Sequence, residues 1–209
     1  RNVNGKTGAE YLRAATWRGH EALVCDYPWP HMFDLITREY DDRHGISDDH
    51  LVKIAEINFA NAKRNTMAQT RDWHFAAGSF SDDDALNPSI DGRVRKLDCG
   101  QITDGAACII LASERVAKAH ATKLGLRLAD IPCVKGWGHR SAPISLDTKL
   151  AQSRGQDIIF PHAAQTMTDA LNRAGLRSVN EVDGLETHDC FTVTEYMAIH
   201  HSGLTATGQ

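Results

Sequence analysis

We predict an α/β fold for this chain, a layered α-β-α sandwich preceded by an irregular helical region. The second half alternates short apolar runs of strand length with segments that have helical periodicity. Strands that alternate with helices are typical of a sheet covered by helices on its faces. The expected strands lie at 108–111, 131–138 and 182–187, and the expected helices at 113–120, 161–174 and 192–202.

The helices of the second half have recognisable boundary signals. Ser113 is a good N-cap, Pro161 is placed to open a helix, and Gly175 is placed to stop it. Thr192 and Glu195 have the spacing of a capping box, and Gly203 offers the following stop. We therefore expect the last helix to begin near Thr192.

The first half has fewer clear elements. Residues 1–30 mix glycines with aromatic residues and prolines, which favours an irregular surface excursion. A short helix is expected at 33–40. A better one is expected at 48–64, where an apolar stripe faces a charged side. Residues 65–92 are rich in turn formers and are interpreted as loop and turn.

Composition limits the class of protein. With 209 residues, 42% hydrophobic and 24% charged, the chain can bury a substantial core. A net charge of −4 and a pI near 6.3 argue against a general nucleic-acid binder, which usually has a basic face. No apolar run is long enough to cross a bilayer, and Arg1–Lys6 lacks the apolar core of a secretory signal. We expect a soluble intracellular protein.

Cysteine and histidine spacing gives no metal motif. The five cysteines lack Cys-x-x-Cys pairing, so reduced thiols are expected rather than a zinc site or a disulfide scaffold. None of the eleven histidines lies in a His-Glu-x-x-His arrangement. His200 and His201 are adjacent and should point in different directions on a helix. We expect no metal site.

The run His188-Asp189-Cys190 lies just upstream of the last expected helix, which makes this corner the main functional candidate. Unsatisfied N–H groups and the positive end of the helix dipole favour negative charge there. Such a corner can hold an oxyanion, and it is also expected to lower the pKa of Cys190. The alternative interpretation is a strand-to-helix turn that merely contains polar residues.

His188 to Phe191 resembles the His-Asp-Cys-Phe signature of the sterol carrier protein X-type thiolases. Ile102 to Ala107 is similar to the Ile-Asn-Asp-Gly-Ala-Ala stretch of thiolases. Trp29–His31 with Ala68–Arg71 resembles the thiolase loop domain that holds coenzyme A, and Arg173–Leu176 resembles the end of a helix in the C-terminal half. The resemblance implies a loop domain at 1–96, the end of the N-terminal half at 97–128 and the start of the C-terminal half at 129–209.

The resemblance also implies roles for individual residues. His188 inherits the histidine that donates to the thioester oxygen and is the expected catalytic residue. Phe191 would pack the acyl or pantetheine channel, with a plain core aromatic as the alternative. Asp189 would order the corner and Cys190 would line the site. Two further residues are assigned to substrate or coenzyme A binding, namely Gly100 and Arg140, the latter through a phosphate.

Several thiolase motifs are absent from the sequence. The early nucleophilic cysteine, the late cysteine with its Gly-rich loop, and the Gly-His-Pro-type histidine have no counterpart here. By resemblance, Cys108 and Cys133 belong to buried strands and Cys99 to the preceding turn. We therefore expect the chain to be part of a longer polypeptide, or to be completed by another chain, and not to be active alone.

The implied function is acyl transfer on coenzyme A thioesters, as 3-ketoacyl-CoA thiolysis or acetyl-CoA condensation. Coenzyme A would be a substrate, and no cofactor is expected. One alternative is a thiolase-like aldolase subunit that cleaves steroid side-chain CoA esters with a partner protein. Another is a non-catalytic acyl-CoA-binding subunit. The resemblance further implies a homodimer or homotetramer, cytoplasmic in bacteria and peroxisomal in eukaryotes, with no nucleic acid and no membrane span.

Overall fold

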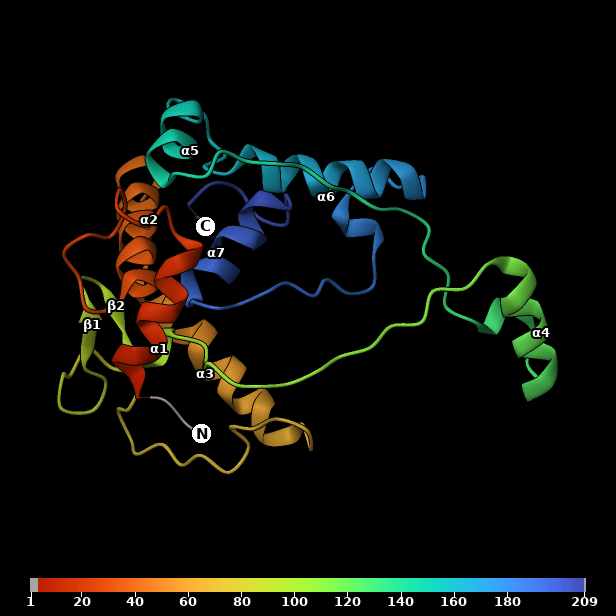
Figure 1. The fold of residues 1–209 in the computed structure, drawn as a ribbon, viewed down its shortest axis with the longest axis horizontal. Coiled ribbons are helices and arrows are strands. Elements are labelled where there is room, and N and C mark those ends of the chain that lie inside the picture. The colour runs from red at the N-terminus through yellow and green to blue at the C-terminus, as the bar shows by residue number, and fades with distance from the viewer. Residues whose placement is uncertain (1–3, 209) are drawn as a thin grey trace.

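The computed structural model describes residues 4–208, and these residues are mainly helical (Figure 1). The α-helices are α1 (Gly5–Leu12), α2 (Pro28–His44), α3 (Asp48–Arg64), α4 (Glu114–Leu124), α5 (Leu146–Gln152), α6 (Pro161–Ala174) and α7 (Thr192–His201). The 3-10 helices are η1 (Arg13–Ala15), η2 (Lys96–Asp98), η3 (Leu128–Asp130) and η4 (Val179–Glu181). Strands β1 (Ser89–Asp91) and β2 (Val94–Arg95) form a two-stranded antiparallel sheet. No helix among residues 4–208 is long and apolar enough to span a membrane.

The hydrophobic core lies where α7 packs against α2 and α3, and the β1–β2 hairpin packs on α2. Tyr40 of α2 is fully buried, and Tyr196 of α7 meets it edge-on with ring centroids 5.4 Å apart. Phe191 stacks on Phe33 of α2 at 4.1 Å. The predictions of a helix at 48–64 and of its apolar stripe are confirmed, because Leu51 and Ile54 belong to this core.

The prediction for residues 1–30 is wrong in part, and residues 1–3 lie outside the described residues. Asn4 caps α1 by accepting a hydrogen bond from the Thr7 N–H at 2.9 Å, a local signal that the glycines obscured. Helix α2 begins at Pro28, earlier than the expected 33. A proline in the first helical turn loses no intrahelical hydrogen bond, so the Pro-rich stretch opens this helix.

The layered α-β-α sandwich is not confirmed. The expected strands at 108–111, 131–138 and 182–187 have no strand partner among residues 4–208 and run as extended segments. A strand needs a neighbour to receive its N–H and C=O groups, and an apolar pattern does not say where that neighbour is. Ile109 and Ile110 are accordingly 85% and 88% exposed. Cys108 and Cys133, placed by resemblance in buried strands, are both exposed.

The helices that border these segments were predicted more accurately than the strands. Helix α6 starts at Pro161 and is followed by Gly175 in the left-handed conformation, as expected. Ser113 occupies the N-cap of α4, but its side chain makes no capping hydrogen bond. Figure 1 shows α4 apart from the other helices at the end of two extended stretches.

One extended segment, residues 136–140, packs directly along α6. Arg173 donates to the Trp137 carbonyl and places its guanidinium 5.2 Å from the centroid of the Trp137 ring. Arg140 pairs with Asp169 at 2.7 Å. Gly136 and Gly138, two residues apart, approach the helix so closely that a Cβ on either would overlap a carbonyl oxygen of α6. Both glycines are therefore required by contact rather than by an unusual φ angle.

The two C-terminal histidines of α7 are buried and point to different partners, as predicted. His200 Nδ1 lies 3.0 Å from the Tyr40 hydroxyl, and His201 Nε2 accepts the Phe160 N–H at 3.1 Å. Burial, reinforced by His200, lowers the pKa of His201 to about 4, and burial also lowers the pKa of His200. The folded protein thus keeps the His201 imidazole neutral at mildly acidic pH.

We predict that Gly138→Ala lowers the free energy of unfolding by about 1–3 kcal/mol, because the new methyl group must displace the segment from the Thr166 carbonyl of α6. Chemical denaturation measures this change. Gly184→Ala is the matched control, since a Cβ there meets nothing within 4 Å, and it should change stability by no more than about 0.5 kcal/mol. Equal stability of the two variants would contradict the packing described.

We predict a second stability effect from His201. Its folded pKa of about 4 lies below the unfolded value near 6.5, so the unfolded chain binds a proton that the folded chain refuses. Stability should therefore fall as pH falls from about 6.5 to about 4, by roughly 2–3 kcal/mol for this group. His201→Gln should flatten that part of the stability profile.

The control for this experiment is His139→Gln, because His139 is exposed. It should leave the acid dependence unchanged. An unchanged acid dependence in His201→Gln would show that this imidazole is not held neutral.

Candidate functional site

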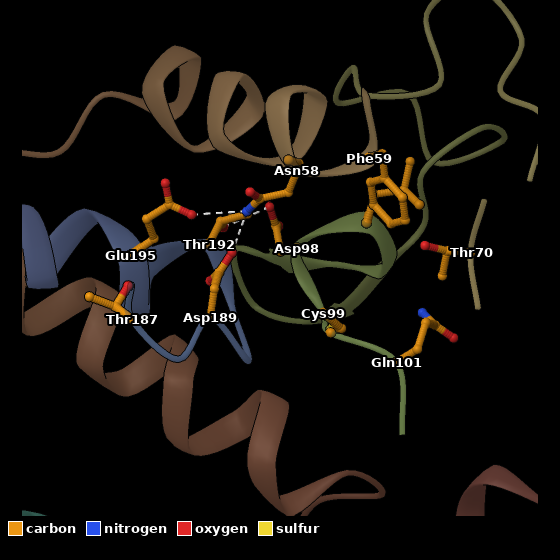
Figure 2. Close-up of a pocket in the computed structure, with 13 residues that line it drawn as sticks. Asn58, Phe59, Thr70, Asp98, Cys99, Gln101, Thr187, Asp189, Thr192 and Glu195 are labelled. Atoms are coloured by element: carbon orange, nitrogen blue, oxygen red, sulfur yellow. Dashed lines mark hydrogen bonds between the residues drawn. The ribbon is translucent and has the colours of Figure 1, made fainter. Parts of the chain in front are cut away.

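A pocket of about 300 Å³ lies beside the N-terminus of α7 (Figure 2). Its walls come from α3, from η2 and the turn that follows it, from Thr70, and from the segment that enters α7. Thr187 and Asp189 belong to that segment. The pocket therefore joins the candidate corner to parts of the chain more than 80 residues earlier, as the 94-residue separation of the Thr192–Asp98 hydrogen bond illustrates.

Helix α7 begins at Thr192, as predicted, but the capping box is wrong. Phe191 is the N-cap residue and makes no side-chain capping bond. The Thr192 hydroxyl donates instead to Asp98 Oδ1 of η2 at 3.0 Å. Glu195 turns to α3, where it accepts from the Asn58 amide. Both side chains that suggested a local cap thus make long-range contacts.

The Asn58 amide nitrogen lies between two carboxyl groups. It donates to Asp189 Oδ2 at 2.6 Å and to Glu195 Oε2 at 2.9 Å, as the dashed lines in Figure 2 show. Burial raises the pKa of Asp189 to about 7, with the negative charge of Glu195 and a hydrogen bond between the two groups adding to the effect. Asp189 Oδ1 is buried without a hydrogen-bond partner. These features favour protonation of Asp189 at pH values up to about neutral.

Gly100 is brought to the corner, as its assignment to the site requires. Its N–H donates to the Cys190 carbonyl at 2.7 Å, next to an antiparallel bridge between Cys99 and Phe191. A Cβ at Gly100 would come within 3.2 Å of the same carbonyl oxygen, a tight approach that suits glycine. Gly100 and Asp189 both line the pocket.

His188 lies at the corner but does not line the pocket. It is exposed, whereas its neighbours Thr187 and Asp189 are among the lining residues. Successive side chains of an extended segment point to opposite faces, and Figure 1 shows the stretch between η4 and α7 as extended. The His188 imidazole is therefore presented on the face away from the carboxyl groups.

The expected lowering of the Cys190 pKa is wrong. Burial raises the pKa of Cys190, and it raises the pKa of Cys99 to about 12, with Asp98 and Cys190 contributing. The dipole of a helix ten residues long does not outweigh the loss of water around these thiols. Both cysteines are thiols rather than thiolates at neutral pH.

Two assigned residues lie away from the pocket. Phe191 is 7% exposed and forms part of the core through its stack on Phe33, which agrees with the alternative of a core aromatic. Arg140 is half-exposed and is paired with Asp169 on α6. Neither lines the pocket, so the structure does not bring the six assigned residues into one cavity.

Sequence reasoning missed Asn58, Asp98 and the true partner of Glu195. Asn58 lies on the buried face of α3, four residues after Ile54 and three after Ala55, so it is a polar residue within the apolar stripe. This position was the available signal, although it does not show which partners the amide meets. Its contact with Asp189 spans 131 positions. Within residues 4–208, no group of three or more His, Cys, Asp or Glu side chains is arranged to hold a metal ion.

Known proteins resemble this chain over most of its length, although no protein-family model matches it. Human sterol carrier protein 2 is 26% identical over 181 residues, which cover 86% of this chain and 30% of that protein. An acetyl-CoA acetyltransferase of Methanothermobacter thermautotrophicus is 25% identical over 194 residues, which cover 92% of this chain and 45% of that protein. The non-specific lipid-transfer protein-like 2 of Caenorhabditis elegans is 26% identical over 179 residues, which cover 85% of this chain and 40% of that protein.

The chain thus spans less than half the length of these relatives. Two of these kinds of protein, sterol carrier protein 2 and acetyl-CoA acetyltransferase, agree with the resemblance found for the His-Asp-Cys-Phe run. The sequence is therefore related to the thiolase superfamily, in its sterol carrier protein X-like branch.

Proposed function

We propose that this chain is part of a thiolase-family acyltransferase that acts on coenzyme A thioesters. The observation that carries the proposal is the His188–Phe191 run directly before α7, in a chain related to an acetyl-CoA acetyltransferase along 92% of its length. In the proposed reaction a thiolate attacks the ketone carbonyl of a 3-ketoacyl-CoA. The bond between C2 and C3 then breaks, and acetyl-CoA leaves as its enolate and takes up a proton at C2. The coenzyme A thiol finally accepts the shortened acyl group and releases the attacking thiol.

His188 is the proposed donor to the thioester oxygen. Its exposure leaves the ring free to meet a substrate, and it lies four residues before the first residue of α7. Negative charge that develops on the thioester oxygen in the transition state would be stabilised by the imidazole and by the nearby helix N-terminus. Loss of one such donor typically costs about a hundredfold to a thousandfold in turnover.

The attacking thiolate is proposed to come from elsewhere in the complete protein. The raised pKa values of Cys99 and Cys190 make both poor nucleophiles at neutral pH. Each is also held by local contacts, with Cys190 Sγ lying 3.6 Å from the Thr194 hydroxyl. The proposed role of this chain is therefore to supply the oxyanion corner and part of the coenzyme A cap.

A second candidate is a non-catalytic protein that binds acyl-CoA or another lipid. The observation that favours it is the relative named a non-specific lipid-transfer protein-like 2. Binding of coenzyme A by the complete protein without thiolysis of acetoacetyl-CoA would select this candidate. Thiolysis with release of acetyl-CoA would select the acyltransferase.

We predict that His188→Ala in the complete protein lowers kcat for acetoacetyl-CoA thiolysis by about a hundredfold to a thousandfold, while coenzyme A binding changes by less than about threefold. Steady-state kinetics and calorimetric titration with coenzyme A measure the two effects. His139→Ala is the matched control, because His139 is also exposed but lies in the loop after the Gly136–Gly138 contact. Turnover of His188→Ala equal to that of the control would remove the assignment.

A further inference from the structure

We propose that Asn58 is a positioning residue, whose amide holds Asp189 and Glu195 as a pair sharing one proton and thereby fixes the backbone beside His188. We call Asn58, Asp189 and Glu195 the carboxyl clamp. The part of this inference that concerns turnover rests on the proposed function. The part that concerns proton binding and stability does not.

The geometry of the clamp supports this role. One amide nitrogen has two hydrogens, and here both have a carboxyl oxygen within 2.6–2.9 Å. The two acceptors come from different places, Asp189 from the extended segment and Glu195 from the first turn of α7. A single side chain of α3 therefore ties both sides of the corner together, across 131 and 137 positions of sequence.

The groups around the clamp favour a single proton shared by the carboxyl groups of Asp189 and Glu195. Of the residues that line the pocket, the titratable ones are Asp98 and Cys99 from the η2 side, together with Asp189 and Glu195. Helix α3 contributes the uncharged Ala55, Asn58 and Phe59, and none of the lining residues is a lysine, arginine or histidine. Two half-buried carboxylates that meet the same nitrogen repel each other, and without a cation among the lining residues the state of lower free energy carries one proton. An amide can donate to a carboxylate and to a carboxylic acid at once, so Asn58 suits that state.

Few other contacts would stabilise Asp189 as a carboxylate. Its second oxygen, Oδ1, is buried and accepts no hydrogen bond. An unpartnered oxygen is tolerated far better on a neutral acid than on a carboxylate. Loss of the proton at higher pH would therefore push the two groups apart and loosen the clamp.

The clamp holds the segment that carries His188. On one side of this residue, Asp189 is fixed by its side chain, and Cys190 is fixed through its carbonyl by the Gly100 N–H. His188 itself has no described hydrogen-bond partner and takes its place from these neighbours. Movement of Asp189 by a small distance would be transmitted directly to the next residue along the backbone.

The first test measures stability against pH in the complete protein. A group protonated when folded and ionised when unfolded contributes stability that is lost as pH rises from the unfolded pKa toward the folded one. We expect the unfolding equilibrium constant of wild type to rise about tenfold or more, relative to Asp189→Asn, between pH 4.5 and 7.5. The matched control is Asp183→Asn, since Asp183 is an exposed carboxylate of the same segment, and it should follow wild type. Identical pH profiles for wild type and Asp189→Asn would overturn the proposal.

The second test exchanges the amide and the acid. Asn58→Asp places a third carboxyl group in the clamp, and its melting temperature should fall progressively further below that of wild type as pH rises above 6. The double variant Asn58→Asp with Asp189→Asn restores one amide and two carboxyl groups, and it should regain most of the lost stability. A double variant no better than Asn58→Asp would mean that Asn58 only fills space, and the proposal would be lost.

Turnover provides the third measurement. In the complete protein, kcat of Asn58→Asp should fall at least tenfold more above pH 7.5 than at pH 6, with coenzyme A binding nearly unchanged, and the double variant should restore it. Failure of the stability tests defeats the clamp whatever the activity is. Absence of thiolysis in wild type, with the stability results as expected, defeats the proposed function and leaves the clamp standing.

Discussion

The burial of α7 is the constraint on which the rest of the described structure depends. Val193 and Met197 are 2% and 5% exposed, and they pack in the same core as residues of α2 and α3. At the head of the helix, the stack of Phe191 on Phe33 sets where the chain must enter. Burying an aromatic side chain of this kind contributes about 1.5–3 kcal/mol, compared with about 0.5–1.5 kcal/mol for a typical neutral hydrogen bond. The position of the candidate site therefore follows from apolar packing, and its polar contacts refine it.

The extended segments show a second constraint, the need of a strand for hydrogen-bonded neighbours. Residues 101–112 and 132–135 have exposed side chains and are paired with no strand among residues 4–208, so their N–H and C=O groups are left to solvent. By contrast, residues 136–140 pack closely along the surface of α6. Gly136 and Gly138 meet the backbone of α6, and Arg173 binds the carbonyl between them. Glycines two positions apart give the segment one flat face, which is the arrangement of a strand lying against a helix.

The sequence predicted those features that depend on local signals. Helices α3 and α6 could be predicted because their apolar stripes, Pro161 and Gly175 act within a few residues. The start of α7 was also correct, although for the wrong reason, since Thr192 and Glu195 serve Asp98 and Asn58 rather than the helix end. A capping box and a pair of tertiary contacts look the same in sequence when the residue types coincide. The partners of Asn58 could not be predicted, because the two carboxyl groups that accept from its amide lie more than 130 positions away in the sequence. The prediction of a lowered Cys190 pKa was wrong, because the sequence indicates the helix N-terminus but not the burial of the thiol, which raises the pKa.

The two faces of the segment that enters α7 are suited to different work. Thr187 and Asp189 face a pocket without cations, where charge is costly and a shared proton removes it. His188 faces the opposite, exposed side, where an imidazole is free to donate to a bound carbonyl. Asp189 and His188 are adjacent in an extended segment, so a fixed Asp189 also fixes the position of the His188 backbone. Because Asp189 is held as a neutral acid, it does this without placing a negative charge beside His188. A charged Asp189 next to His188 would oppose an oxyanion at the corner, so neutrality of the clamp serves the electrostatics of the corner as well as its shape.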